Sequence, residues 1–266
     1  MDVYLNFIFF VLGTCVGSFL NMAIFRLART YKLIKKADMG IRPYNKDRSF
    51  CDFCGRQLSW YENVPILSWI LQMGKTRCCG KKLSLQYPLL EISTGFIFLQ
   101  IYNFQIYNFQ TMIIYLVIAS LLMFSLVFDL KYMILPDRAN MALVIVALIL
   151  ILGRYGNLPL QYIYSGLGAL LFFFILNRIK IRGSEAMGMG DVKYSLFMGL
   201  FLGWPNIIVA IYFAFVVGAI ISIVLMLLKI VKKENPIPFG PFLILGTAVA
   251  KIWGEQIIKI FFGVLF

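Results

Sequence analysis

Long apolar runs, separated by short polar breaks, cover most of this chain. They lie at about 4–27, 86–104, 110–130, 138–153, 160–178, 190–203, 205–229 and 239–264. A helix of about 20 apolar residues crosses the hydrocarbon core of a bilayer. The pattern therefore predicts an all-α fold, a polytopic membrane helical bundle of about eight spans. The sixth run is short, and the last one leaves open a pair of half-helices around 251–255.

One long polar segment, residues 28–84, interrupts this pattern. It contains every cysteine except Cys15. We expect three parts: a first transmembrane span at 1–27, a small cytoplasmic cysteine domain at 28–84, and a transmembrane core at 85–266.

Basic residues are unevenly distributed, and this predicts the orientation. The net charge is +13, and 13 of the 25 Lys and Arg lie between Arg26 and Lys82. Cytoplasmic loops of membrane proteins carry such an excess. Counting crossings places three later loops on the same side: 131–138, 179–190 and 230–238. The remaining Lys and Arg lie mostly in short loops, which argues against a nucleic-acid interface.

The chain has no histidine, and this narrows the possible chemistry. Ser–His and Cys–His catalysis and His-ligated metal sites are excluded. Only 12 residues are Asp or Glu, so each acid in an apolar run is informative. Three acids lie in or at the ends of such runs: Glu91, Asp129 and Asp191.

Asp129 and Asp191 are expected at the same cytoplasmic boundary, on different helices. Two close carboxylates in a low dielectric cannot both ionise, so they suit acid–base hydrolysis by an aspartyl dyad, with no cofactor for proteolysis. Gly188 and Gly190 leave room for a substrate backbone or a partner helix. In the alternative interpretation each aspartate pairs with Lys131 or Lys193, or caps a helix. For Glu91 the alternatives are a protonated carboxyl, or a bond to a neighbouring helix or to the cysteine segment, and we expect a structural role.

The four cysteines of the polar segment form two pairs. Cys51 and Cys54 have the spacing of a zinc knuckle, whereas Cys78 and Cys79 are adjacent, and Thr76 stands where a second CxxC would begin. Four thiolates on two loops predict a zinc site, with Cys78 in altered geometry. Reduced free thiols are the alternative, because disulfides are rare in the cytoplasm.

Taken together, these motifs resemble the type IV prepilin peptidase family, which are membrane aspartyl proteases of the GxGD type. Six segments carry the resemblance, in order along nearly the whole chain: GSFLNMAIFRL (17–27), CDFCGRQLSWYENVPILSW (51–69), CCGKKLSLQYPLLEISTG (78–95), FDLKYMILPD (128–137), GMGD (188–191) and IPFGPFLILG (237–246).

The resemblance implies an endopeptidase of the bacterial cytoplasmic membrane, with the active site facing the cytoplasm. Asp129 and Asp191 would be its catalytic pair, and residues 85–266 its peptidase core. Its substrates would be type IV prepilins or pseudopilins, whose short basic leader is cut after a glycine. Many family members also methylate the new N-terminal residue with S-adenosylmethionine. No Rossmann glycine fingerprint is present, so methylation rests on the resemblance alone.

Two other functions are compatible with the composition. A transporter or channel could use an intramembrane Asp pair as a cation or proton site, but it would usually place the pair near the middle of the bilayer. A membrane scaffold could assemble through its cysteine segment, but it gives no reason for glycines beside an aspartate.

Overall fold

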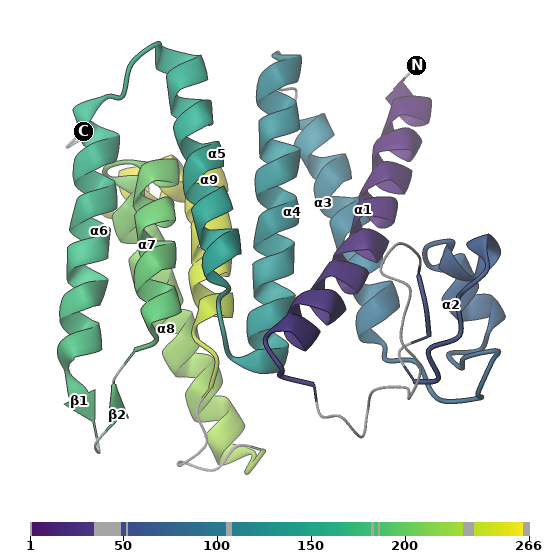
Figure 1. Cartoon of the computed structure of the whole chain (residues 1–266). Coiled ribbons are helices and arrows are strands. Elements are labelled where there is room, and N and C mark those ends of the chain that lie inside the picture. The colour runs from purple at the N-terminus through teal and green to yellow at the C-terminus, as the bar shows by residue number, and fades with distance from the viewer. Residues whose placement is uncertain are drawn as a thin grey trace. The chain divides into compact units, whose positions relative to one another are not determined.

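A computed structural model describes residues 2–34, 49–51, 53–104, 108–181, 184–185, 187–230 and 237–262. In these ranges the elements, labelled in Figure 1, are α1 (Asp2–Thr30), η2 (Trp60–Asn63), α2 (Leu67–Leu71), α3 (Gln86–Asn103), α4 (Phe109–Tyr132), α5 (Asp137–Tyr155), α6 (Leu160–Arg178), β1 (Lys180–Ile181), β2 (Ser184–Glu185), α7 (Met189–Leu202), α8 (Asn206–Leu227) and α9 (Gly240–Phe262). The predicted helical fold is confirmed, and each long helix lies within a few residues of a predicted apolar run.

Five helices are long and apolar enough to cross a membrane: α1 from Val3, α4, α5, α6 and α8. The helix α7 has only 14 residues. The count of eight spans therefore stays a prediction. The helix α9 continues through residues 251–255 without a break, so the alternative of two half-helices was wrong.

The chain forms two compact units, Met1–Val127 and Phe128–Phe266. The three-part division expected from the sequence stays a prediction. Each unit is built around a close approach of helices.

In the first unit, α1 packs along α3 through glycines. A Cβ on Gly13 would lie 2.7 Å from the Cα of Gly95, and one on Gly17 would lie 2.7 Å from the Cα of Glu91. Small residues four apart let two membrane helices approach to backbone contact. The segment GTCVG (13–17) therefore sets the position of Glu91 relative to α1.

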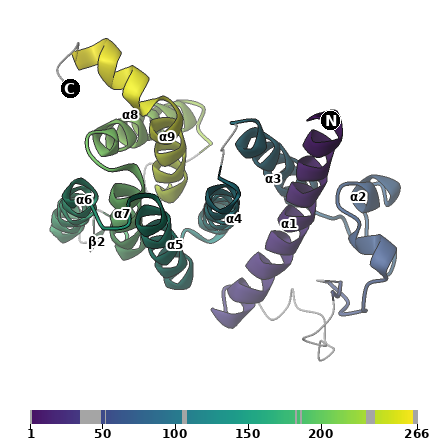
Figure 2. The ribbon, with the colours of Figure 1, turned by 90° about the horizontal axis from the view of Figure 1, so that it is seen from above.

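In the second unit, α7 lies between α5, α6, α8 and α9 and contacts all four (Figure 2). A helix that is apolar on all sides is one buried on all sides. At its contact with α6, Gly199 lies against the backbone of Ser165 and Gly166 so closely that a side chain would clash. The first turn of α7, which carries Asp191, is thus fixed by a rigid core.

Candidate active site and cysteine cluster

Asp129 and Asp191 both belong to the second unit and both are buried. Asp129 lies in the last turn of α4, and Asp191 in the first turn of α7. Only 4% of Asp129 and 9% of Asp191 is exposed. The two carboxylates are close enough to interact electrostatically. In the described part of the chain, neither one forms an ion pair.

The start of α9 holds the Asp129 carboxylate. The backbone N–H of Gly240 donates a hydrogen bond to it. The Oδ2 atom of Asp129 is buried and has no hydrogen-bond partner among the described residues. A Cβ at position 240 would lie 2.5 Å from this oxygen, so a larger residue there would displace the carboxylate. One carboxylate oxygen is thus held, and the other keeps its hydrogen-bonding capacity.

Asp191 is held by its own helix start. Its carboxylate accepts a hydrogen bond from the backbone N–H of Gly188, the N-cap of α7. The capping contact considered from the sequence is therefore present. The predicted alternative of an Asp191–Lys193 ion pair was wrong, because Lys193 pairs with Asp137 at 2.8 Å.

The glycines flanking Asp191 have different surroundings. A Cβ on Gly190 would lie 3.0 Å from the Cβ of Leu135, so this glycine makes room for the segment between α4 and α5. The buried Leu135 also contacts the position a Cβ on Gly240 would take. Gly188 is exposed beside the Asp191 carboxylate. Of the two, only Gly188 leaves space that a substrate backbone could occupy.

Two buried asparagines hold the loop that carries the glycines. The Nδ2 of Asn140, on α5, donates to the carbonyl oxygen of Gly190 at 3.1 Å. The Nδ2 of Asn177, at the end of α6, donates to the carbonyl oxygen of Met187 at 2.6 Å. Both residues are buried, with 2–3% exposed, and the two bonds fasten the segment 187–190 to α5 and α6.

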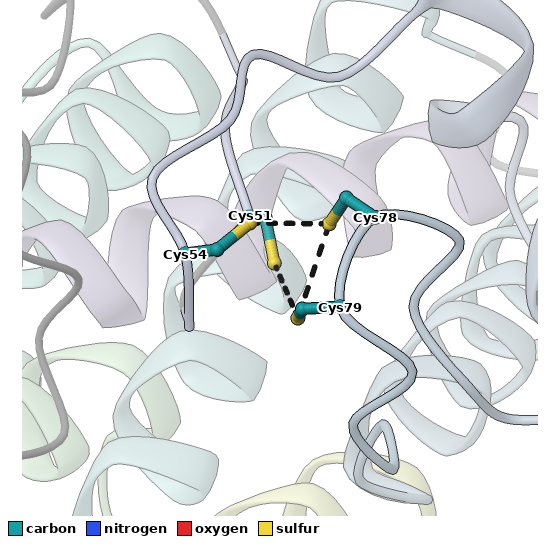
Figure 3. Close-up of side chains that lie close together, drawn as sticks. All are labelled: Cys51, Cys54, Cys78 and Cys79. Atoms are coloured by element: carbon teal, nitrogen blue, oxygen red, sulfur yellow. Dashed lines mark hydrogen bonds between the residues drawn. The ribbon is translucent and has the colours of Figure 1, made fainter.

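The four cysteines of the polar segment converge in the first unit (Figure 3). All their Sγ atoms lie within 4.8 Å of one another. Cys54 and Cys78 are 3.2 Å apart, Cys51 and Cys79 3.9 Å, and Cys78 and Cys79 4.0 Å. Four thiolates at about 2.3 Å from a tetrahedral zinc would be about 3.8 Å apart. The cluster has the donor atoms and the size to hold such an ion.

The cluster is built from two loops with the same backbone pattern. In the first loop the backbone N–H of Cys51 donates to the carbonyl oxygen of Arg56, and the carbonyl oxygen of Cys51 accepts from the N–H of Gly55. In the second loop the backbone of Thr76 makes the same two hydrogen bonds, with Lys81 and Gly80. Gly55 and Gly80 both have positive φ, near +70°. Thr76 thus takes the place of Cys51, Cys79 that of Cys54, and Cys78 is an additional thiol inside the second loop.

Thr76 acts on the cluster through its hydroxyl. Its Oγ1 lies 3.1 Å from the Sγ of Cys79, and this hydrogen bond lowers the pKa of the Cys79 thiol to about 7. Burial, with hydrogen bonds to its neighbours, raises the pKa of Cys78 to about 12. Metal binding must therefore displace the proton of Cys78.

Comparison with known proteins finds two matching family models, one covering the cysteine cluster and the other covering Asp129 and Asp191. Residues 11–104 match the bacterial peptidase A24 N-terminal domain, and residues 116–223 match the type IV leader peptidase family. A protein of Aeromonas hydrophila is 30% identical over 94% of this chain and 91% of its own length. The chain belongs to the type IV leader peptidase family.

Other members of this family give the same result. A protein of Pseudomonas aeruginosa is 29% identical over 94% of this chain and 90% of its own length, and one of Burkholderia pseudomallei is 32% identical over 92% and 84%. All three relatives are named prepilin leader peptidase/N-methyltransferase. No solved structure matches the chain.

In this leader peptidase family member, the expected contact between Glu91 and the cysteine segment is present. The Oε2 atom of Glu91 accepts a hydrogen bond from the backbone N–H of Ile66 at 2.7 Å. Ile66 has a φ of +63°, which is unfavourable for a β-branched residue. Glu91 therefore ties α3 to a strained point just before α2.

The sequence reasoning did not single out Leu135, Asn140, Asn177 or Gly240. The only available signal for the asparagines was an amide within or at the end of an apolar run, where a polar side chain needs a partner. Gly240 stood inside the quoted segment 237–246 but carried no chemistry of its own. Its role follows from the contact with Asp129.

Proposed function

We propose that this chain is a membrane aspartyl endopeptidase that removes the short basic leader of type IV prepilins or pseudopilins. One observation carries the proposal: two buried carboxylates from α4 and α7 interact with each other, and that of Asp191 lies beside the exposed Gly188. The names of the relatives supply the substrate class.

In the proposed reaction the pair shares one proton. The ionised carboxylate takes a proton from a water, whose oxygen attacks the carbonyl carbon of the last leader glycine. The protonated carboxyl donates to the carbonyl oxygen. When the tetrahedral intermediate collapses, the C–N bond breaks and the amine nitrogen takes up a proton from the pair. The hydrogen bonds from Gly188 and Gly240 keep both carboxylates in position throughout.

The site does not favour transport. A transporter usually binds its ion near the midplane, between broken helices. Here α4 and α7 are unbroken, with Asp129 in the last turn of one and Asp191 in the first turn of the other. The charge bias of loops 131–138 and 179–190 supports a cytoplasmic position, although 182–183 and 186 lie outside the described residues.

We further propose that the chain methylates the new N-terminus with S-adenosylmethionine, as the names of the relatives suggest. The methyl donor, when bound, would supply an activated methyl group to the new N-terminal amine, which would release a proton, and the sulfur would leave as a neutral thioether. Zinc, held by Cys51, Cys54, Cys78 and Cys79, would fix the cysteine loops without taking part in this step.

The test is co-expression with a prepilin, measuring leader removal by mass spectrometry. Asp129→Asn and Asp191→Asn should each lower cleavage by about 10³-fold, since each removes a general acid–base group. Asp137→Asn is the matched control, because its carboxylate is 63% exposed and pairs with Lys193 instead. Normal cleavage by either dyad variant would refute the dyad.

A further inference from the structure

A cavity of about 350 Å³ lies in the first unit, between α1, α3 and the cysteine segment. Its volume falls in the range of small-ligand sites. Ser18 and Phe25 line it from α1, Glu91 from α3, and Phe50, Glu62 and Trp69 from the cysteine segment. Neither carboxylate of the proposed peptidase site belongs to this wall.

Two buried glutamates face this cavity, and their charges are compensated differently. Glu62 pairs with Arg56 at 3.1 Å and also accepts the N–H of Ser59. Glu91 is 5% exposed and receives hydrogen bonds from Ile66 and Ser18, but no cation pairs with it among the described residues. A buried carboxylate without a counter-charge is costly, and a cationic ligand would remove that cost.

The rest of the wall suits a flat, partly polar ring. Phe25, Phe50 and Trp69 contribute aromatic rings to the lining, and a nucleobase packs favourably against such rings. The Nε1 of Trp69 is buried and has no hydrogen-bond partner within the described residues. Buried indole N–H groups usually have an acceptor, so this donor is available to a ligand atom.

We propose that this cavity binds the methyl donor S-adenosylmethionine, with Glu91 facing its sulfonium and the aromatic wall holding its adenine. The inference rests on the methyltransferase part of the proposed function. The donor combines the two groups the cavity selects: a fixed positive charge and a heteroaromatic ring. Because Cys51 and Cys78 also line the cavity, the cysteine cluster forms part of the same wall.

The test compares two ligands that differ in the charge on sulfur. Equilibrium dialysis with the purified full-length protein in detergent measures binding of S-adenosylmethionine and of its neutral thioether product, S-adenosylhomocysteine. Glu91→Gln keeps an oxygen acceptor for the Ile66 N–H but loses the charge. This substitution should lower the affinity for S-adenosylmethionine by about 30-fold or more, as expected for loss of one partner of a buried charge pair. Binding of the thioether should change by less than about threefold.

A second variant and a control separate charge from folding. Met22→Trp fills the cavity from α1 and should abolish binding of both ligands. Glu255→Gln, at an exposed position on α9, should leave both affinities unchanged. A cooperative thermal unfolding transition, measured on the same preparations, should persist in all three variants and so reports an intact fold. Leader cleavage should also persist, because the peptidase carboxylates lie in the second unit.

The outcomes distinguish the cavity from the function on which it rests. If the unmodified protein binds neither ligand and leaves the cleaved pilin unmethylated, the methyltransferase function fails and the cavity assignment fails with it. If it methylates the pilin but Met22→Trp binds both ligands normally, the donor lies elsewhere and only the cavity assignment is overturned. An equal loss of both ligands in Glu91→Gln would refute the sulfonium contact.

Discussion

At the scale of single residues, Gly240 has the most demanding position in the proposed peptidase site. Its N–H holds the Asp129 carboxylate, and any Cβ would lie 2.5 Å from Asp129 Oδ2. We predict that Gly240→Ala moves this carboxylate and lowers the rate of leader cleavage by about 100-fold, as small misplacements of catalytic groups do. Cleavage kinetics on a purified prepilin measure the effect.

Gly168→Ala is the matched control, because a Cβ at this position on α6 meets nothing within 4 Å. It should cleave at the normal rate. If Gly240→Ala cleaves as fast as this control, the Gly240–Asp129 contact has no catalytic importance.

Cys78 occupies an unusual place in the cysteine cluster, and its contribution can be tested by rescue. Cys78→Ser removes one of four thiolates, so we predict that bound zinc, measured by metal analysis, falls well below the ~1 ion per chain of the intact site. Adding Thr76→Cys places a thiol where the second loop matches Cys51. The double variant should recover the metal.

The control is Cys15→Ser, which changes a thiol on α1 outside the cluster. It should keep the zinc content of the unmodified protein. Full zinc content in Cys78→Ser alone would mean that Cys78 is not a ligand, and failure of the rescue would count against the equivalence of the two loops.

Among elements, the proposed site depends on hydrogen bonds that fasten the start of α7 to its neighbours. Asn140→Leu removes the hydrogen bond from α5 to the Gly190 carbonyl in the first turn of α7. We predict a loss of about 0.5–1.5 kcal/mol in the free energy of unfolding, the usual net contribution of one hydrogen bond. The kcat for leader cleavage should fall more than KM changes, since the same turn carries Asp191. Denaturation and kinetics on the same sample measure both.

Asn157→Leu, at an exposed position between α5 and α6, is the matched substitution and should change neither quantity. A stable Asn140→Leu protein with normal kcat would show that α6 and the α7 core hold the loop without this bond.

Sequence predicted the elements well because their boundaries have local causes. The helices α5 and α7 end at Gly156 and Gly203, and α6 begins directly after Pro159. The Asp and Cys candidates were predictable because their side chains carry recognisable chemistry. The packing of Leu135 between Gly190 and Gly240 could not be predicted, because it depends on how the helices are rotated against one another. The same limit explains why the sequence did not predict the ion pair of Lys193 with Asp137.

At the scale of the whole molecule, the two proposed sites belong to different compact units. The cysteine cluster and the cavity lie within Met1–Val127, whereas Asp129, Asp191 and the residues that hold them lie within Phe128–Phe266. Cleavage and methyl transfer should therefore respond differently to damage in the first unit.

Metal removal tests this separation. Without a metal, the loops carrying Cys51 and Cys78 lose a shared anchor, and these loops form part of the cavity wall. We predict that zinc chelation lowers methylation of the pilin N-terminus at least tenfold more than it lowers leader cleavage, as expected when metal binding contributes to local folding. Mass spectrometry of the pilin reports both reactions in one sample, and restored methylation after adding zinc rules out irreversible damage. Equal loss of both reactions would instead mean that the cysteine cluster supports the peptidase site as much as the methyl-donor cavity.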